Sequence, residues 1–383
     1  MSGRLVRKAG TAVVAAVTAG TLLASGTAMA APGPGERLEK RSVPKLLTDL
    51  QTLYRQTEEA TERYNGTEEK LRRQQEQVGR LNARLAKARV ALHDSRGAAG
   101  RLARQQYQGS SDFSSYVRLL LARDPQQALD QTHVLQRVSL NRVETVDRLA
   151  DGEKEANTLA ASARKALDDQ LTLAERQKRE RDDVQKRLGE VEKLLASLTA
   201  GQLAELARLE AAGTAEAQRK FVASGALSSA RPPSSAGNAA LRYAVEQIGK
   251  PYEWGAEGPG AYDCSGLTSQ AWAHAGQEIP RTSQEQWDSL ERVPLGELRP
   301  GDLVLYFPGA THVGIYLGDG MVVQAPRPGA AVKVSPIAAN PVLGAVRPDP
   351  SAEGMSGYRP PVLPAGARDG SDAGYGLDVA PSP

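Results

Sequence analysis

The hydrophobic pattern divides the chain into three unlike parts. From Val43 to Leu102, and again from Val146 to Leu198, apolar and small residues recur every 3.5 residues among Ala, Glu, Arg and Gln. Sustained heptad spacing of this kind predicts coiled-coil helices. The predicted seam of the first helix is Leu50, Leu53, Thr57, Ala60, Tyr64, Thr67, Leu71, Gln74, Val78, Leu81, Leu85, Ala88, Leu92, Ser95, Ala99 and Leu102. The predicted seam of the second is Val146, Leu149, Glu153, Ala156, Ala160, Ala163, Leu167, Gln170, Ala174, Gln177, Arg181, Val184, Leu188, Val191, Leu195 and Leu198.

A break separates the two helical runs. The stretch "YQGSSDFSSYVRLLLARDP" contains Gly109, a serine cluster and Pro125, but it keeps an apolar patch from Val117 to Leu121. Two long helices joined in this way predict an antiparallel hairpin over residues 36–222, and sixty helical residues make a rod of about 90 Å. Many seam positions are polar or small, so we expect the rod to bind a partner or to dimerise, and an inert spacer is the alternative.

The remaining chain is predicted to hold one compact domain between two irregular segments. Residues 223–237 contain Pro232-Pro233 and lack an apolar period, which is typical of a linker. Residues 350–383 are rich in Pro, Gly, Ser and Asp and are predicted to be disordered. Residues 238–349 contain all three tryptophans and have the length of a single small domain.

The first thirty residues have the pattern of a signal peptide. Arg4, Arg7 and Lys8 precede an apolar stretch from Ala9 to Ala24, and Ala28-Met29-Ala30 forms a small-x-small cleavage site. An uncleaved anchor is the alternative, but the apolar stretch is shorter than the roughly 20 residues of a spanning helix. The sequence therefore predicts an exported protein.

Composition narrows the chemistry of an exported protein. The chain carries 48 basic and 45 acidic residues, a net charge of +3, which is too balanced to indicate nucleic-acid binding. It has a single cysteine, Cys264, where exported proteins commonly pair their cysteines as disulfides. The sequence has no Cys/His cluster of the kind that binds zinc. The single thiol is therefore intermolecular, incidental or reactive.

The position of Cys264 favours the reactive alternative. An amphipathic helix over "NAALRYAVEQIGKPYEW" is predicted to stop at Gly249 and Pro251, and Cys264 then begins a second helix that ends at Gly276. A helix N-terminus favours a thiolate, the form that attacks carbonyl groups. His274 lies about 15 Å along the same helix and cannot reach the thiol, so His312 is the candidate base.

The segment "HVGIYLGDGMVVQAP" predicts a β-hairpin that presents this histidine. A three-residue loop, Gly318-Asp319-Gly320 with Gly320 left-handed, places Leu317 opposite Met321. The apolar residues then share one face: Val313, Ile315, Leu317, Met321, Val323 and Ala325. His312 and Gln324 lie on the other face as diagonal neighbours, which supplies a nucleophile, a base and a group that orients the base.

Each of these residues also has a structural interpretation. A free cysteine often packs as a small buried hydrophobe. A single histidine in a strand is commonly structural, and amides on edge strands serve solubility. The combination of one usable thiol, one reachable imidazole and a shared face favours catalysis.

Four blocks of the domain resemble a known family. In order they are "PYEWGAEGPGAYDCSGLTSQAW", "IPRTSQEQW", "GDLVLY" and "HVGIYLGDGMVVQAP", and they resemble the NlpC/P60 cysteine peptidases of bacterial cell walls. The likeness covers residues 238–349. It implies an α+β papain-like domain, here preceded by an all-α antiparallel coiled-coil hairpin, and it implies no cofactor and no metal.

The resemblance also implies roles for individual residues. Cys264 would attack the amide between D-glutamate (or D-isoglutamine) and the diamino acid of the peptidoglycan stem peptide, with His312 as the base. Tyr252, twelve residues before the cysteine, would donate to the oxyanion, although by itself it would be a core aromatic. Asp263, Ser265 and Ser283 match positions that line the substrate groove.

These groove residues also have purely structural interpretations. Asp263 suits a helix N-cap, and the two serines suit first-turn and loop hydroxyls. Arg281 has no role that spacing assigns, and a surface ion pair explains it equally well.

The third member of the triad is most often histidine in the family, whereas this chain has Gln324. An amide still accepts from the imidazole but adds no charge, so we expect activity with a lowered histidine pKa.

The leading hypothesis is a secreted, wall-associated peptidoglycan endopeptidase. A non-catalytic adaptor that binds stem peptides is the alternative from another class, and an amidase resembling the CHAP group is a third. Resemblance to coiled-coil wall hydrolases implies a membrane division complex of the FtsEX type as partner. The linker and the Val117–Leu121 patch also suggest autoinhibition, with the patch covering the groove.

Overall fold

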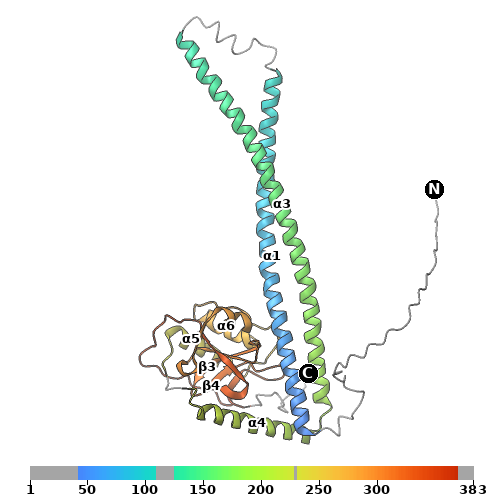
Figure 1. Ribbon diagram of the computed structural model, residues 1–383, viewed down its shortest axis with the longest axis vertical. Helices are drawn as coiled ribbons and strands as arrows, with labels where there is room; N and C mark the ends of the chain where they lie inside the picture. The colour runs from blue at the N-terminus through green and yellow to red at the C-terminus, as the bar shows by residue number, and fades with distance from the viewer. Residues whose placement is uncertain (1–41, 109–124, 228–230, 370–383) are drawn as a thin grey trace, which may run out of the picture. The chain divides into compact units, whose positions relative to one another are not determined.

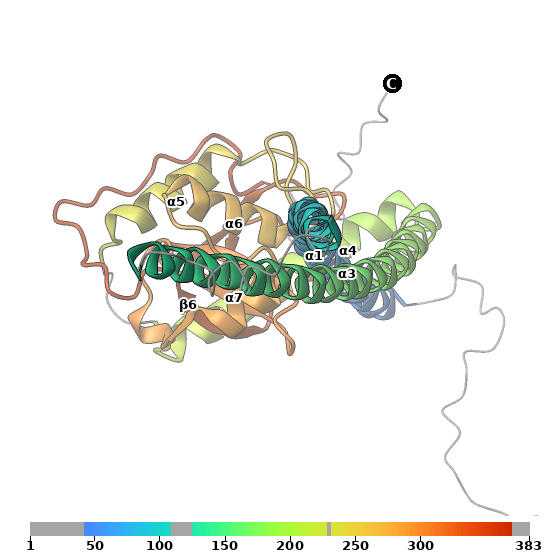
Figure 2. The same cartoon turned by 90° about the horizontal axis from the view of Figure 1, so that it is seen from above.

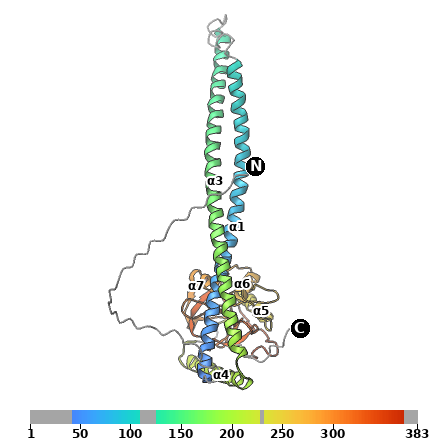
Figure 3. The same ribbon diagram turned by 90° about the vertical axis from the view of Figure 1, so that its right-hand side faces the viewer.

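The computed structural model describes residues 42–108, 125–227 and 231–369. Two long helices, α1 (Val43–Gln108) and α3 (Pro125–Ala196), lie side by side in Figures 1 and 3. Their contacts show opposite directions, because Gln74 donates to the carbonyl of Ala166 while the earlier residue Arg63 pairs with the later Asp183. The predicted antiparallel hairpin is confirmed. The predicted signal peptide and the Val117–Leu121 patch lie outside the described residues.

The predicted seam is correct in α1, and in the second helical run twelve of its sixteen positions are buried or half-buried. From Leu71 to Leu102 every predicted seam position of α1 is buried or half-buried. In α3, Ala156 and Ala163 are buried as predicted, but Val146 and Leu167 are exposed, while Leu159 and Ala166 are buried instead. An α-helix turns every 3.6 residues, so steps of three and of four both return to one face. The buried residues Ala156, Leu159, Ala163 and Ala166 alternate steps of three and four, and the packing against α1 fixes the order of these steps.

A third helix follows the hairpin within the region predicted as coiled coil. Helix α4 (Ala200–Ala223) begins with a capping box in which Thr199 accepts from Gln202, and Gln202 accepts from Thr199. Its Leu206 packs with Leu46, Leu50 and Tyr54 of α1. Farther along, Gln218 donates to the carbonyl of Gly320 at 2.9 Å and accepts from the amide of Ala338 at 3.1 Å. Helix α4 thus joins α1 to the C-terminal domain.

The C-terminal domain contains one antiparallel sheet of six strands, in the order β1-β6-β2-β3-β4-β5. The strands are β1 (Glu291–Val293), β2 (Leu303–Tyr306), β3 (His312–Gly318), β4 (Met321–Gln324), β5 (Lys333–Pro336) and β6 (Val342–Arg347). The domain helices are α5 (Ser235–Glu246), α6 (Cys264–His274) and α7 (Ser283–Ser289), with 3-10 turns η3 (Leu295–Glu297) and η4 (Ile337–Ala339). The predicted α+β class is confirmed.

Both faces of the sheet are buried. Helices α5 and α6, which lie next to each other in Figure 2, pack with Val313, Ile315 and Val323 on one face. On the other face Phe221 of α4 and Leu227 pack against a cluster that includes Tyr306 and Val322. Because strand side chains alternate, one hairpin can supply both layers.

The β3–β4 hairpin has the predicted register with one local change. Ile315 pairs with Val323 and Tyr316 with Val322, as a three-residue loop requires. A bulge at the turn then places Met321 opposite Gly318 rather than Leu317. Gly320 has a φ of +70°, the left-handed conformation expected of it.

The first part of the C-terminal tail is ordered, contrary to the prediction that it is disordered from Pro350. The guanidinium of Arg299 donates to the carbonyl of Ala352 at 2.7 Å, and the amide of Val334 donates to the carbonyl of Ala367 at 2.8 Å. Leu363 also packs against the domain core. Proline-rich backbone makes few internal hydrogen bonds, so its order depends on docking sites that composition does not reveal. Among the described helices, none is long and apolar enough to cross a membrane.

Candidate active site

Cys264 is the first residue of α6, as predicted. Asp263 caps the helix by accepting from the amide of Gly266 at 2.7 Å, which confirms its N-cap interpretation. The thiol is 1% exposed and belongs to the domain core. Cys264 is thus held rigidly at a helix N-terminus whose first N–H groups have no partner within the helix.

The protonation state of the thiol differs from the expectation. Burial raises the pKa of Cys264 well above its usual range, and the carboxylates of Glu62, Asp263 and Glu58 raise it further, against the lowering effect of Arg281. The helix N-terminus is therefore outweighed, and the thiol stays protonated in this conformation. Two of the three carboxylates come from α1, outside the C-terminal domain.

The side-chain amide of Gln324 holds His312, as the hairpin register predicted. Its Nε2 lies 2.7 Å from Oε1 of Gln324, in the diagonal position that the hairpin register creates. Because an amide oxygen only accepts, Nε2 carries the proton and Nδ1 is left with a lone pair. Nδ1 lies 3.4 Å from Oε1 of Glu58. His312 therefore presents a basic nitrogen toward α1.

The imidazole is neutral in this environment. Burial lowers the pKa of His312 to about 4, while the hydrogen bond with Gln324 raises it. The lowered pKa agrees in direction with the expectation, but its main cause is burial rather than the missing charge at Gln324. Asp263, the neighbour of Cys264, also raises the histidine pKa, and Glu58 raises that of the thiol. The charge of Asp263 thus raises the pKa of both the thiol and the imidazole.

Tyr252 is buried beside the thiol. Its backbone is fixed by a bridge to Tyr262 and by donation to the carbonyl of Ala330 at 2.9 Å. Burial raises the pKa of Tyr252 well above its ordinary value, and the proximity of Cys264, whose thiolate would repel a phenolate, is the second cause. The phenol therefore keeps its proton and can act as a hydrogen-bond donor next to Cys264.

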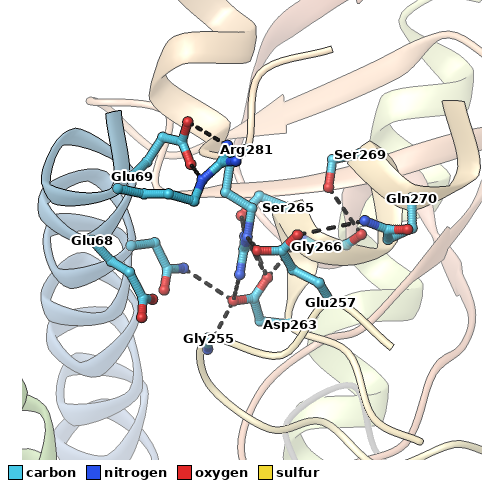
Figure 4. Close-up of polar contacts among 12 residues, drawn as sticks. Glu68, Glu69, Gly255, Glu257, Asp263, Ser265, Gly266, Ser269, Gln270 and Arg281 are labelled. Carbon is cyan, nitrogen blue, oxygen red and sulfur yellow. Dashed lines mark hydrogen bonds and ion pairs between the residues drawn. The ribbon is translucent and has the colours of Figure 1, made fainter. Parts of the chain in front are cut away.

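Arg281 organises the polar side of the site and is not the surface residue considered from the sequence. Only 10% of its side chain is exposed, and it donates to Asp263 at 2.7 Å, to Ser265 Oγ at 2.8 Å and to Glu257 at 2.8 Å (Figure 4). Burial lowers its pKa, but the carboxylates around it offset this and raise the pKa above its usual value. Arg281 therefore stays charged and balances the buried Asp263.

Ser265 and Ser283 point their hydrogen-bond donors to one place. Ser265 Oγ accepts from Arg281, so its single proton is directed to Glu62 Oε1 at 2.8 Å. Ser283, the first residue of α7, donates to Glu62 Oε2 from its amide at 2.8 Å and from its hydroxyl at 2.9 Å. The predicted groove residues thus form a pocket of donors that suits a carboxylate.

Three site residues come from α1 and were not predicted. Glu58, Glu62 and Asn65 are buried although they are polar, and Asn65 Nδ2 donates to Asp263 Oδ2 at 3.0 Å. Their spacing of four and three residues places them on one helix face. That polar stripe was visible in the sequence, but nothing in the sequence showed what covers it. No group of residues suited to a metal ion occurs in the described chain.

Comparison with known proteins agrees with this geometry. Residues 249–344 match the model of the NlpC/P60 family. The C-terminal domain is an NlpC/P60 domain. Strands β1 to β5, α6 with Cys264 at its start and β3 with His312 at its start lie within the matched range, which ends inside β6.

The relatives of this NlpC/P60 chain match it over only part of its length. A probable endopeptidase of Corynebacterium glutamicum is 51% identical over 96 residues, which cover 25% of this chain and 46% of the relative. A probable endopeptidase of Mycobacterium tuberculosis is 39% identical over 119 residues, or 30% of this chain and 31% of the relative. The chain thus spans less than half the length of these relatives.

The solved structure of RipD from Mycobacterium tuberculosis, described as a non-catalytic NlpC/p60 domain protein adapted to peptidoglycan binding, is 32% identical. That likeness covers 29% of this chain and 96% of RipD, with a TM-score of 0.27.

Proposed function

We propose that this protein is a peptidoglycan endopeptidase with a Cys-His thiol mechanism. The bond cleaved is the amide between D-glutamate, or D-isoglutamine, and the diamino acid of the stem peptide. The main support is the state of His312, whose Nε2–H is tied to Gln324 while the lone pair of Nδ1 faces the site. The NlpC/P60 family and the relatives named probable endopeptidases support the same class of reaction.

The proposed reaction uses these groups in sequence. Nδ1 of His312 takes the thiol proton, and the Cys264 sulfur attacks the carbonyl carbon of the D-glutamyl residue. The resulting oxyanion accepts from the Cys264 amide and the Tyr252 hydroxyl. When the C–N bond breaks, His312 returns the proton to the leaving amine. Water, deprotonated by His312, then attacks the thioester, and the sulfur leaves as the acid product forms.

The donor pocket supports the choice of the acyl side. Ser265 and Ser283 supply three N–H or O–H donors near Cys264, and Arg281 adds positive charge behind Ser265. The free α-carboxylate of a γ-linked D-glutamyl residue, on the acyl side of the reacting carbonyl, matches such a set.

A non-catalytic adaptor is the second candidate. Cys264 and His312 are 1% and 0% exposed, which favours a protein that holds its thiol out of reach. In that case the domain would bind stem peptides and recruit another hydrolase.

Export to the cell wall and an FtsEX-type membrane partner belong to the same proposal. Exposed apolar side chains on α3, among them Val134, Val138 and Leu140, support a partner for the hairpin. Binding of the full mature chain to the extracellular part of such a complex, lost on replacing these residues by Ser, is the corresponding test.

Product mapping on purified peptidoglycan tests the enzyme proposal. The full mature chain and its Glu62→Arg variant, intended to displace α1, are each compared with the matching Cys264→Ala chain, and the fragments are identified by mass spectrometry. We expect new D-glutamyl carboxyl ends and free diamino-acid amines, absent in both Cys264→Ala chains. Cleavage at the sugar attachment would indicate an amidase, and digestion that persists without the thiol would exclude the mechanism. No digestion by an opened chain whose thiol reacts freely would favour the adaptor.

A further inference from the structure

Helix α1 covers the candidate active site. Between Tyr54 and Asn65 it buries polar residues that do not belong to an ordinary coiled-coil seam, including Glu58, Thr61 and Glu62. Glu58 and Glu62 lie one helical turn apart, and both raise the pKa of Cys264 by their charge. A substrate cannot reach a thiol that is 1% exposed, so this helix and the substrate exclude each other.

Glu62 is bound as an acidic ligand would be. Its carboxylate accepts from the Ser283 amide, the Ser283 hydroxyl and the Ser265 hydroxyl, all between 2.8 and 2.9 Å. The thiol of Cys264 also points to it, with Sγ 3.8 Å from Oε1. Buried carboxylates are rare unless they are fully hydrogen-bonded, and this one uses the donors of the groove. The groove therefore contains a carboxylate supplied by the chain itself.

Glu58 engages the base on the other side of the thiol. Its Oε1 lies 3.4 Å from Nδ1 of His312, the nitrogen that must receive the thiol proton. The burial of Glu58 raises its pKa well above the usual value, while Arg327 lowers it. The Glu58 carboxyl thus covers the basic nitrogen of His312, as Glu62 occupies the groove.

Contacts before Glu58 and after Glu62 along α1 also hold the helix against the C-terminal domain. The Arg327 guanidinium lies 4.1 Å from the centre of the Tyr54 ring. At the other end Tyr64 packs edge-on against Trp254 with ring centres 5.0 Å apart, and Asn65 bonds to Asp263. The contact with the catalytic domain thus extends over three turns of α1.

We propose that residues Tyr54 to Asn65 of α1 are an intramolecular, substrate-mimicking inhibitor in which Glu62 takes the place of the substrate carboxylate and Glu58 occupies His312. This inference rests on the proposed function for the identity of the substrate. The covering segment is α1, whereas the sequence suggested the Val117–Leu121 patch, which lies outside the described residues.

The composition of the contact suits reversible release. The α1 residues that enter the site are mainly charged or polar, so they tolerate water when the helix leaves. The seam with α3 uses other residues, such as Leu85 and Leu92, and does not depend on the catalytic domain. Beside Glu58 a cavity of about 440 Å³ lies among α1, α4 and the loop that carries Arg327, so the contact is not close-packed there. The hairpin can therefore persist while the site opens.

The reactivity of the single cysteine tests the inhibitor without relying on hydrolysis. Iodoacetamide is added to the full mature chain and the mass increase is followed with time, which reports only Cys264. Glu62→Arg places a cation among donors and is expected to raise the alkylation rate about tenfold or more, since loss of charged hydrogen bonds of this kind shifts an equilibrium by that factor. Glu62→Gln, which keeps the shape of the side chain, is expected to give a smaller increase.

Glu59 provides the matched control on the same helix. Its side chain is 39% exposed and pairs with Arg55 rather than with the site. Glu59→Arg and Glu59→Gln should therefore react at the wild-type rate. Circular dichroism verifies that each variant keeps its helices.

Two results separate the inhibitor from the proposed function. A Glu62→Arg chain that stays folded but whose thiol reacts no faster than that of wild type, with Glu62→Gln equally slow, would overturn the inhibitor. If the thiol of the Glu62→Arg chain reacts faster as expected but the chain still does not digest peptidoglycan, the result supports α1 as the cover of the site. The proposed endopeptidase activity would then be rejected, and the inhibitory contact would stand.

Discussion

The His312 ring and the Gln324 side chain form a 2.7 Å hydrogen bond across neighbouring strands. The bond links the proposed base to a neutral amide on β4, four residues after the turn that sets the register. It orients the ring and selects the tautomer with the proton on Nε2, and the lone pair of Nδ1 is the consequence. Gln324 is neutral, so it can orient the His312 ring only through the geometry of this hydrogen bond. A charged residue at this position would also act through its charge.

Replacing Gln324 by Ala should lower wall digestion by on the order of 10- to 100-fold, because the ring loses both its orientation and its tautomer. Gln324→His, the residue most common in the family, should retain activity and move the acidic limb of the pH–rate profile. The assay is turbidity loss of purified peptidoglycan across pH in the Glu62→Arg background. An unchanged profile in both variants would show that Gln324 has only a packing role.

Tyr252→Phe removes one hydroxyl and leaves the ring packing intact. If the phenol donates to the oxyanion, digestion should fall about 100-fold, the usual loss for one such donor. Alkylation of Cys264 should continue at the parent rate, because it forms no oxyanion. Equal losses in both assays would instead mean that the hydroxyl supports the fold.

Arg281→Ala should destabilise the domain by about 3 kcal/mol, because it leaves the buried Asp263 without its cation. The exposed pair of Arg179 with Glu175 provides a matched control, and Arg179→Ala should change stability by less than about 0.5 kcal/mol. Thermal unfolding followed by the tryptophan signal of the C-terminal domain measures both. A similar midpoint for the two variants would contradict the assigned role of Arg281.

Gly266→Ala should destabilise the domain although alanine favours helices. A Cβ at this position would overlap the carbonyl oxygen of Ala256 and lie 2.9 Å from Asp263 Oδ1, and we expect a cost of about 3 kcal/mol. Gly189→Ala in α3, where nothing lies within 4 Å, should stabilise its helix by about 1 kcal/mol. Thermal melts of the two variants should therefore move in opposite directions.

The alkylation rate of Cys264 should depend on pH in a way that reports Glu62. Burial raises the pKa of the thiol most, and the Glu62 carboxylate is the next cause. Glu62→Gln removes that negative charge, so the thiolate becomes easier to form and the midpoint of the rate–pH curve should move to lower pH. Glu59→Gln should leave the midpoint unchanged. A midpoint that moves upward in Glu62→Gln would contradict the assigned electrostatics.

The local elements of the fold were largely predictable, because they depend on neighbours in sequence. The heptad spacing indicated two coiled-coil helices, the Asp263-Cys264 boundary indicated a helix start, and the loop length set the hairpin register that brings Gln324 to His312. The seam of the second helix was wrong at four of sixteen positions, because steps of three and four are equivalent until a partner helix fixes their order. The order of residues 350–369 was missed because docking of an irregular segment leaves no periodic signal.

The chemistry at Cys264 shows the same division. The sequence by itself determined which groups are available: one thiol, one reachable imidazole, an amide in register and the groove serines. Only the tertiary structure decided the state of that thiol, because its pKa depends on burial and on carboxylates about 200 residues earlier in the chain. Helical spacing shows that Glu58 and Glu62 share a face of α1, but it contains no information on which surface meets that face. Long-range packing alone brings those two carboxylates to Cys264 and His312.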